Sequence, residues 1–393
     1  MRAALTTALR LWESKAVDGE GKIGANVRQR VYALASRLLA GALVAAVWTG
    51  VSSSNASKSS QLSTAGAITW LSAATATSSK DAWAVGQSSA PRGKTTRTVI
   101  EHWNGTAWKL RSSPNVAIHN FLADVAAVSA GRAWAVGYSY GTPAHRDSGP
   151  PGPLIERWNG AAWKVVAGPN VEADLAGVAA TSATNAWAVG FSSGRTLIEH
   201  WNGSTWKLQP SPNVGAGPNQ LVDVAATSAT NAWAVGFRDT SSAARPLIEH
   251  WNGKVWKVQS IPKVGIQLQG VAATSASNAW AVGGSLIERW NGKAWKVESS
   301  PDVGIGLYGV AAISGTDAWA VGHRGDRPVI VHWDGTAWEV QSGPAVSGSS
   351  LQGVAATSAD NAWAVGLQGG SHSRTLIEHW DQTAWEVQPS PNP

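Results

Sequence analysis

The chain has 393 residues, with 31 Lys and Arg against 25 Asp and Glu, and it contains no Cys. The lack of Cys excludes disulfides and Cys-based zinc sites. Because 14% of the residues are charged and 44% are apolar, the chain fits neither a disordered polyampholyte nor a membrane bundle.

The basic charge is concentrated near the N-terminus. Residues 1–56 hold seven of the Lys and Arg residues and three of the acids, which leaves 24 bases and 22 acids in the remainder. A nearly neutral body gives no electrostatic footprint for nucleic acid, so we expect no nucleic-acid partner.

The N-terminal segment has the layout of a secretory signal peptide. Arg28, Arg30 and Arg37 precede an uncharged apolar run of 14 residues, Leu38 to Val51. A helix of this length rises about 21 Å, short of the roughly 30 Å hydrocarbon core of a bilayer. We therefore assign 1–56 to a long n-region plus signal peptide and 57–66 to a Ser/Ala-rich linker. The alternative is an uncleaved signal anchor, which would supply the expected membrane contact; both place the protein outside the cytoplasm, secreted or at the cell surface.

A single pattern recurs from residue 71 to the C-terminus. Its first landmark is Ala-Trp-Ala-Val-Gly, which repeats over 280 residues in six steps, a mean period near 47. The Trp residues of this landmark are Trp83, Trp134, Trp187, Trp233, Trp280, Trp319 and Trp363. The second landmark is a Trp pair five residues apart: Trp103/Trp108, Trp158/Trp163, Trp201/Trp206, Trp251/Trp256, Trp290/Trp295, Trp333/Trp338 and Trp380/Trp385. A Leu stands twelve residues before each first Trp.

Each repeat carries four short strand signals and no helical period. In the third repeat Gly190 is expected to stop the second strand, and Asn202-Gly203 predicts a tight turn with positive φ at both residues. The four strands expected there are Leu175 to Ser182, Ala186 to Val189, Leu197 to Trp201 and Trp206 to Gln209.

Four-stranded repeats of this length predict an all-β, seven-bladed β-propeller over residues 67–393. The rival is an open β-solenoid, which needs degenerate capping repeats, whereas the first and last repeats here keep all three Trp. A closed ring should bring residues 67–70 beside the last strand, around Val387. Strand alternation puts Trp and Val of the first landmark on one face and Ala on the other, so we interpret the repeated Trp as packing residues.

These landmarks resemble bacterial propellers of the Asp-box (BNR) and photosystem-assembly-factor type, in which a Trp-Ala-Val-Gly strand precedes a hairpin ending in Gly-x-x-Trp. Gly105 to Trp108 match the end of the Asp-box turn, but Trp103 and Glu101 stand where the box has Asp and Ser. The resemblance covers residues 71–393 and implies the fold, not an activity.

A Glu followed by His or Arg precedes the second Trp in six repeats, as in Glu199-His200. One residue type copied around a ring does not converge into a catalytic site, so we interpret these pairs as cross-strand ion pairs and solvated edges. No metal-ligand spacing, phosphate loop or sialidase motif is present, and we predict no catalytic residue, no metal and no cofactor.

The most informative variation lies between the first and second Trp, where the spacing runs 20, 24, 14, 18, 10, 14 and 17 residues. We place this variation in the loop between strands two and three, so that irregular loops gather on one face of the ring, the variable-loop face. Loops on a rigid scaffold commonly carry function. The candidate binding residues of this face are Arg92, Lys94, Arg97, Tyr138, Tyr140, His145, Arg146, Asp147, Phe191, Arg195, Phe237, Arg238, Asp239, His323, Arg324, Arg327, His372 and Arg374.

The function predicted from these observations is a secreted, non-catalytic binding module, expected to be a monomer. It would engage a glycan, a cell-wall polymer or a protein through the variable-loop face. Two alternatives remain open: an extracellular carbohydrate-active hydrolase or lyase using the same face, and a structural or assembly-factor protein that docks a partner.

Overall fold

The computed structural model describes residues 67–142, 149–240, 243–262, 265–301, 304–369 and 373–393. The expected signal segment 1–56 and linker 57–66 lie outside the described residues. Among the residues described, no helix has the length and apolar character needed to cross a bilayer.

The described residues form 28 strands in consecutive groups of four, which we call repeats 1 to 7. Repeats 1 and 2 contain β1 (Ile68–Ser78), β2 (Asp81–Ser89), β3 (Thr96–Trp103), β4 (Trp108–Arg111), β5 (His119–Ser129), β6 (Arg132–Tyr140), β7 (Gly152–Trp158) and β8 (Trp163–Val165). Repeats 3 and 4 contain β9 (Asp174–Ser182), β10 (Asn185–Ser192), β11 (Arg195–Trp201), β12 (Trp206–Gln209), β13 (Asn219–Ser228), β14 (Asn231–Asp239), β15 (Ala244–Trp251) and β16 (Trp256–Val258). Repeats 5 and 6 contain β17 (Gly270–Ser275), β18 (Asn278–Gly283), β19 (Leu286–Trp290), β20 (Trp295–Glu298), β21 (Ile305–Ala312), β22 (Ala318–Arg324), β23 (Arg327–Trp333) and β24 (Trp338–Val340). Repeat 7 contains β25 (Ser349–Ser358), β26 (Asn361–Gln368), β27 (Arg374–Trp380) and β28 (Trp385–Val387), and a short 3₁₀ turn, η1 (Pro91–Gly93), follows β2.

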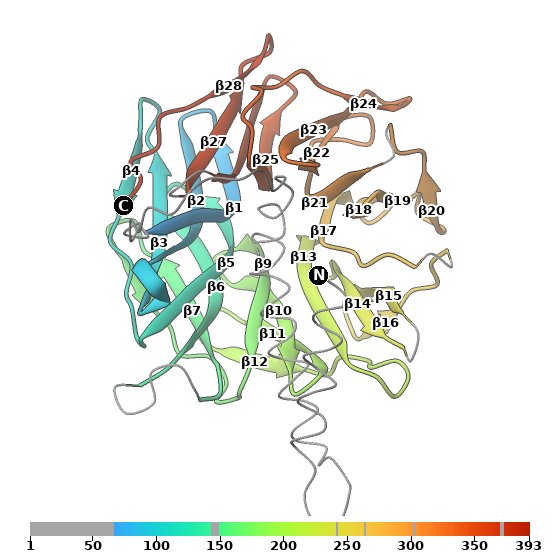
Figure 1. Ribbon diagram of the computed structural model, residues 1–393. Helices are drawn as coiled ribbons and strands as arrows, with labels where there is room; N and C mark the ends of the chain where they lie inside the picture. Colours follow the sequence, from blue (N-terminus) through green and yellow to red (C-terminus); the bar gives the residue numbers. More distant parts are fainter. Residues whose placement is uncertain (1–66, 143–148, 241–242, 263–264, 302–303, 370–372) are drawn as a thin grey trace, which may run out of the picture. The chain divides into compact units, whose positions relative to one another are not determined.

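Within every repeat the strands pair in sequence order and antiparallel, as β13-β14-β15-β16 do. Repeats 1 and 2 are additionally joined by one parallel pairing between Thr96 and His119. The sheets are arranged around a central axis, with the first strand of each repeat innermost and the fourth at the outside (Figure 1). This is the architecture of a β-propeller.

Strand two continues beyond the landmark Gly in every repeat except repeat 5, where β18 ends at Gly283. In repeat 3, β10 runs to Ser192, and Gly190 lies opposite Leu175 where the register of the β9–β10 pair shifts. A Cβ on Gly190 would lie 2.0 Å from the carbonyl oxygen of Asp174. The Gly is therefore required for close approach of two backbones at a bulge, not for strand termination.

The turn between strands three and four also differs from the two-residue turn that was expected. Trp201 pairs with Trp206, so four residues form the connection. Only Gly203 has a positive φ, of 98°. The Asn202 side-chain oxygen accepts hydrogen bonds from the backbone amides of Ser204 and Thr205, both at 3.0 Å. Asn is thus selected as a side-chain acceptor that closes the turn.

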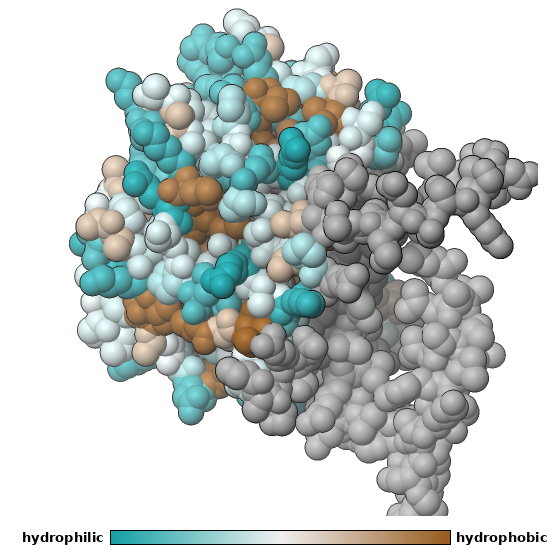
Figure 2. All heavy atoms as spheres, turned by 60° about the vertical axis from the view of Figure 1, so that its left-hand side comes forward, coloured by the Kyte–Doolittle hydropathy of each residue, from teal (hydrophilic) through white to brown (hydrophobic). Residues whose placement is uncertain are grey.

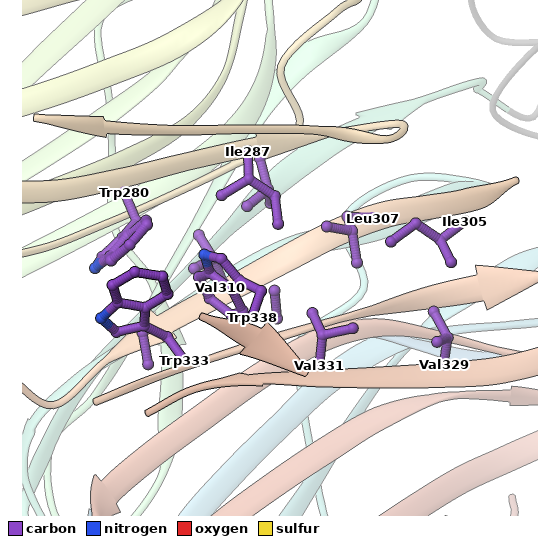
Figure 3. Packing of buried hydrophobic residues seen from close by; sticks show 12 residues of the cluster. Trp280, Ile287, Ile305, Leu307, Val310, Val329, Val331, Trp333 and Trp338 are labelled. Atoms are coloured by element: carbon purple, nitrogen blue, oxygen red, sulfur yellow. The ribbon is translucent and has the colours of Figure 1, made fainter. Parts of the chain in front are cut away.

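Neighbouring sheets meet with large side chains against small ones. Trp280 and Val282 of repeat 5 share a buried cluster with Ala318 and Ala320 of repeat 6 (Figure 3). The equivalent cluster at the end of the chain joins Trp363 of repeat 7 to residues of repeat 1. The predicted division into a Trp/Val face and an Ala face is therefore what packs the sheets together.

Each strand-two Trp forms an aromatic cluster with the Trp pair of the next repeat. The ring centroid of Trp83 lies 5.0 Å from that of Trp158 and 5.2 Å from that of Trp163, both in the next repeat. Trp363 makes the same contacts with Trp103 and Trp108 of repeat 1, at 5.0 and 5.1 Å. All seven strand-two Trp are at most 1% exposed.

The first described strand, β1, packs against the inner strands of repeat 7. The backbone amide of Thr69 donates to the carbonyl of Ser373 at 3.1 Å, and β1 packs against β25 and β26. The expected position of residues 67–70 around Val387 is wrong, because the first strand of each repeat is innermost and Val387 lies on the outer strand β28.

The outer strands are short edges that alternate charge and aliphatic side chains. In β4, Lys109 and Leu110 both face solvent. One aliphatic residue per repeat is 39–49% exposed here: Leu110, Val165, Leu208, Val258, Val297, Val340 and Val387. Figure 2 shows apolar patches that are separated by hydrophilic surface on the side displayed. Short, charged edges of this kind discourage edge-to-edge pairing.

Candidate functional site

The antiparallel order of each repeat places the start of strand one, the end of strand two and the start of strand three at one face, the variable-loop face. Two connections of 11 residues are the longest there: residues 141–151 join β6 to β7, and residues 259–269 join β16 to β17. Part of the length variation lies in the strands and not in the loops, which corrects the sequence-based interpretation: β14 and β15 have 9 and 8 residues, whereas β18 and β19 have 6 and 5. Repeats of different length therefore differ in how far their strands project as well as in their loops.

Repeat 2 carries a stack of four aromatic rings at this face. Phe121 pairs with Tyr138 across β5 and β6, and their rings are stacked with centroids 4.7 Å apart. His119 pairs with Tyr140 in the same way, also at 4.7 Å. Phe121, Tyr138 and Tyr140 are half-buried, and His119 is buried. The structure thus combines the predicted Tyr138 and Tyr140 with Phe121 and His119, which the sequence interpretation missed although both precede Leu122 by one and three positions.

Other predicted aromatic and ionic residues lie at equivalent positions of other repeats. Phe191 and Phe237 directly follow the Gly of their repeats, are half-buried, and occupy the register position of Tyr138. His323 has the same place in repeat 6 and stacks on Tyr308, with centroids 5.4 Å apart. Arg238 and Asp239 end β14 and are also half-buried. These residues share a face but belong to different repeats.

Arginine residues stand at the beginning of strand three in several repeats. Arg97, Arg195, Arg327 and Arg374 are exposed there. Arg245 occupies the corresponding place in β15 and is half-buried. It was missed as a binding candidate, although Arg245-Pro246 and Arg327-Pro328 share one register position and that match was the available signal.

The remaining seven candidates of the variable-loop face include residues inside and outside the described part of the chain. Lys94 and Arg324 are exposed, and the backbone of Arg92 belongs to η1. His145, Arg146, Asp147 and His372 lie outside the described residues.

A central cavity of about 440 Å³ is lined by the first strands of all the repeats. Asp124 and Asp223 line it, and each carboxylate bridges two repeats. Asp124 accepts hydrogen bonds from the backbone amides of Val125 and Val178, at 2.8 and 2.7 Å, and Asp223 accepts them from Val224 and Val271. Burial raises the pKa of both carboxyl groups, and the charge of Asp223 raises that of Asp124 further. With both carboxylates bonded to backbone, their visible role is to join adjacent inner strands.

The Glu residues of strand three are buried between sheets, so the interpretation as ion pairs and solvated edges is wrong for them. Six of them have no exposed surface: Glu101, Glu156, Glu199, Glu249, Glu288 and Glu378. Burial raises the pKa of each, to about 8 for Glu249 and about 7 for the others.

At three joints between repeats, a Ser hydroxyl from the preceding repeat donates to the buried Glu. Ser113 lies 2.9 Å from both carboxylate oxygens of Glu156. The equivalent pairs are Ser211 with Glu249 and Ser390 with Glu101. The last of these links residues 289 apart in sequence and crosses the joint between repeats 7 and 1.

At three other joints the Ser position holds Gly168, Ile261 or Gly343. There, both carboxylate oxygens of the facing residue, Glu199, Glu288 or Glu378, have no hydrogen-bond partner. A buried polar group without a partner is costly, so these three positions are either weak points or places where a further group binds.

The His residues beside these Glu are held within their own sheets. The His102 ring stacks on Trp83, with centroids 4.0 Å apart, and its Nε2 lies 2.8 Å from a carboxylate oxygen of Asp81. His200 contacts Trp187 and Asn185 in the same way. His and Glu of each pair therefore point to opposite faces of the strand, and they do not form a catalytic dyad.

One pocket opens at the joint between repeats 6 and 7, with a volume of about 180 Å³. Arg327 and Gln341 line it together with Gly343, Pro344 and the buried carboxyl group of Glu378. Of the eighteen predicted binding residues, Arg327 is the one among those described that lines this pocket. In the described part of the chain no cluster of three or more His, Cys, Asp or Glu could hold a metal ion.

No family model matches the sequence, and no curated protein is significantly similar to it. Among solved structures, YCF48 from Cyanidioschyzon merolae is 16% identical with a TM-score of 0.54, over 81% of this chain and 97% of that protein. Virginiamycin B lyase from Staphylococcus aureus is 13% identical with a TM-score of 0.56, over 81% and 96% of the two chains. The GH74 xyloglucanase from Xanthomonas campestris has the same identity and TM-score, over 83% of this chain and 55% of that one.

The fold is a β-propeller. At these levels of identity the neighbours show the shared fold and not an activity. The Asp-box or photosystem-assembly-factor character of the repeats is not established by them and stays a prediction.

Proposed function

We propose that this protein is a secreted, non-catalytic binding module that engages a glycan, a cell-wall polymer or a protein through its variable-loop face. The observation that carries the proposal is the aromatic stack of repeat 2. Phe121, Tyr138 and Tyr140 keep part of their rings at the surface of this face, whereas the strand-two Trp residues are fully buried. Half-exposed, rigid aromatic rings offer large contact area at low entropic cost.

The surroundings of the stack support the same proposal. Exposed Arg residues at the start of strand three, such as Arg195 and Arg374, add donors that can pair with carboxylates, phosphates or hydroxyl groups. Tyr and Arg are enriched in binding interfaces. The sheets beneath are packed by Trp and Ala, so these side chains stand on a rigid base.

The proposal includes a seven-bladed ring and export from the cytoplasm. The seven-bladed ring is supported by the Trp363–Trp103 contact and the Ser390–Glu101 hydrogen bond, which join the two ends of the described repeats. Export is supported by the arginine-flanked apolar run at Leu38 to Val51. We also propose that the repeats are of the Asp-box or assembly-factor type, on the Trp-Ala-Val-Gly and Gly-x-x-Trp landmarks.

The test compares wild-type protein with the double variant Tyr138→Ala/Tyr140→Ala on a glycan array, on cell-wall polymers and in pull-downs from the culture fluid and cell surface. A ligand of the wild type should bind at least about tenfold more weakly to the double variant, as expected for loss of about 1.4 kcal/mol or more. Leu208→Ala, an exposed apolar change on the outer strand β12, is the control and should bind normally.

Equal binding by the double variant and the wild type would contradict the proposed face. Hydrolysis or elimination assays on the same polymers separate the alternative enzyme. A product formed by wild-type protein would show that the module is catalytic and overturn that part of the proposal.

A further inference from the structure

A cavity lies at the joint between repeats 6 and 7, where Gly343 stands in place of a side chain. Gly343 occupies the position at which Ser113, Ser211 and Ser390 donate to a buried Glu. A Cβ placed on Gly343 would lie 3.7 Å from Oε2 of Glu378, an ordinary contact distance, so space for a hydroxymethyl group is present. The missing Ser hydroxyl leaves both Glu378 oxygens without a partner.

The other two joints that lack Ser are more closed. A Cβ on Gly168 would lie 3.0 Å from Cδ1 of Ile155 and 3.4 Å from Oε2 of Glu199, which is closer than the 3.8 and 3.7 Å to the equivalent atoms at Gly343. Ile261 places an apolar side chain at the third such joint and packs against the cluster below it. The cavity of about 180 Å³ is found at Gly343, where Pro328 and Ile330 form the opposite wall.

We propose that this pocket binds a hydroxyl-bearing ligand, a single sugar unit or a small polyol, one hydroxyl of which takes the place of the Ser hydroxyl beside Glu378. The inference rests on the proposed function, because the pocket opens at the variable-loop face beside Arg327 and would hold one unit of a glycan bound there. Three other joints of this chain show where the ligand hydroxyl would lie, because the Glu equivalent to Glu378 accepts a hydrogen bond from a Ser hydroxyl at each of them.

The chemistry of the pocket favours a hydroxyl group over a cation. Arg327 is exposed and lines the pocket, so its positive charge opposes an ammonium ligand. Burial raises the pKa of Glu378 to about 7, so near neutral pH its carboxyl group can both accept from and donate to a hydroxyl. Gln341 adds an amide at the wall.

The size of the pocket fits the same class of ligand. Its volume of about 180 Å³ equals roughly six water molecules at about 30 Å³ each. This is room for a compact ring with hydroxyl groups, and Gly343, which lines the pocket, is exposed. Water alone is the competing occupant.

The test measures binding of glucose, N-acetylglucosamine and glycerol to the full chain by saturation-transfer NMR, with Gly343→Ser and Glu378→Val as the variants. Gly343→Ser supplies the internal hydroxyl and fills the cavity, and Ser-Pro is the sequence found at four of the other six joints. Glu378→Val removes the acceptor and copies Val331, the buried residue at this position in repeat 6. Each variant should lower the affinity for the bound probe at least about tenfold, as expected for losing a hydrogen bond to a charged or buried carboxyl group.

Glu288→Val is the matched control, because it makes the same change at a joint where Ile261 fills the space, and it should bind the probe as the wild type does. Absence of binding by the wild type to all three probes, or equal binding by the wild type and Gly343→Ser, would overturn the inference and leave water as the occupant. If Gly343→Ser fails to fold, Glu378→Val gives the decision alone.

The outcomes separate this inference from the proposed function. Loss of polymer binding in Tyr138→Ala/Tyr140→Ala, with the pocket variants unaffected, would keep the binding face and reject the pocket. Probe binding that Gly343→Ser abolishes, with no polymer or protein ligand found, would keep the pocket and reject the larger face. A longer oligosaccharide that competes with the single sugar would identify the polymer as the source.

Discussion

Replacing one unpartnered buried Glu should remove a defined share of the pH dependence of folding. Glu288 has no exposed surface and no partner for either oxygen, and burial raises its pKa from the ordinary 4.5 to about 7. Its removal is tolerable, because repeat 6 has Val331 at the same register position, also fully buried. Glu288→Val is therefore a substitution that the chain already makes in another repeat.

The sign of the effect follows from proton binding. Between about pH 4.5 and about pH 7 the folded protein keeps the proton on Glu288, while the unfolded chain has released it. The unfolded state is thus favoured as the pH rises, and the stability present below the ordinary pKa is lost by the time the pH passes the raised one. The difference of about 2.5 pH units, at about 1.4 kcal/mol each, amounts to roughly 3.5 kcal/mol as an upper value for one residue.

The assay is denaturant unfolding followed by Trp fluorescence, at about pH 4.5 and about pH 8, for the wild type and Glu288→Val. The variant should gain about 2–3 kcal/mol over the wild type at the higher pH and little at the lower one. Comparing variant with wild type cancels the His groups, whose lowered pKa values act in the opposite direction, as for His200 and His250. Glu339→Gln, an exposed acid on β24, is the control. An advantage of Glu288→Val that is the same at both pH values would refute the reasoning.

Three further predictions follow from packing and backbone geometry. Trp233→Ala, which empties a fully buried site, should lower the free energy of unfolding by about 3–5 kcal/mol in thermal or denaturant melts while ligand specificity is kept; a loss of ligand without loss of stability would contradict a packing role. Gly137→Ala puts a Cβ 1.9 Å from the Phe121 carbonyl oxygen and should destabilise by about 2–4 kcal/mol, whereas the control Gly131→Ala meets nothing within 4 Å and should be neutral; similar melts for the two would argue against the tight bulge. Gln382→Gly relieves a φ of 81° at the turn where other repeats have Gly, and we expect a gain of about 1 kcal/mol in the same melts, with no gain as the opposing result.

Much of the architecture could be predicted from the sequence, because it is repeated. The alternation of Trp, Ala and Val predicted two buried faces of different size, and the structure packs Trp280 against Ala318 of the next repeat as that pattern requires. The strand order and the bounds of β12 were also predicted, because Trp206 and Pro210 mark the ends of that strand. The sequence pattern predicted these features correctly because the same local alternation of side chains recurs in every repeat.

Features that depend on two distant segments could not be predicted. Glu156 looked like a surface residue because it is charged and Arg157 follows it, and only the packing of repeat 1 on repeat 2 buries it against Ser113. Two whole strands, β25 and β26, lie between Gly343 and Glu378 in the sequence, and no sequence pattern marks the two residues as neighbours. The pocket between them therefore depends on how repeat 6 packs against repeat 7, which the sequence of neither repeat shows.

Within repeat 2, the aromatic stack also combines a part that the sequence predicted with a part that only the structure shows. The sequence placed Tyr138 and Tyr140 at the variable-loop face, because the spacing between Trp residues varies there. Their pairing with Phe121 and His119 came from the register of β5 against β6, which a bulge between Leu122 and Asp124 shifts. Local side-chain pattern determines which faces of a strand are buried, whereas register and sheet-to-sheet contact, set by the whole ring, decide which buried groups meet and which are left without a partner.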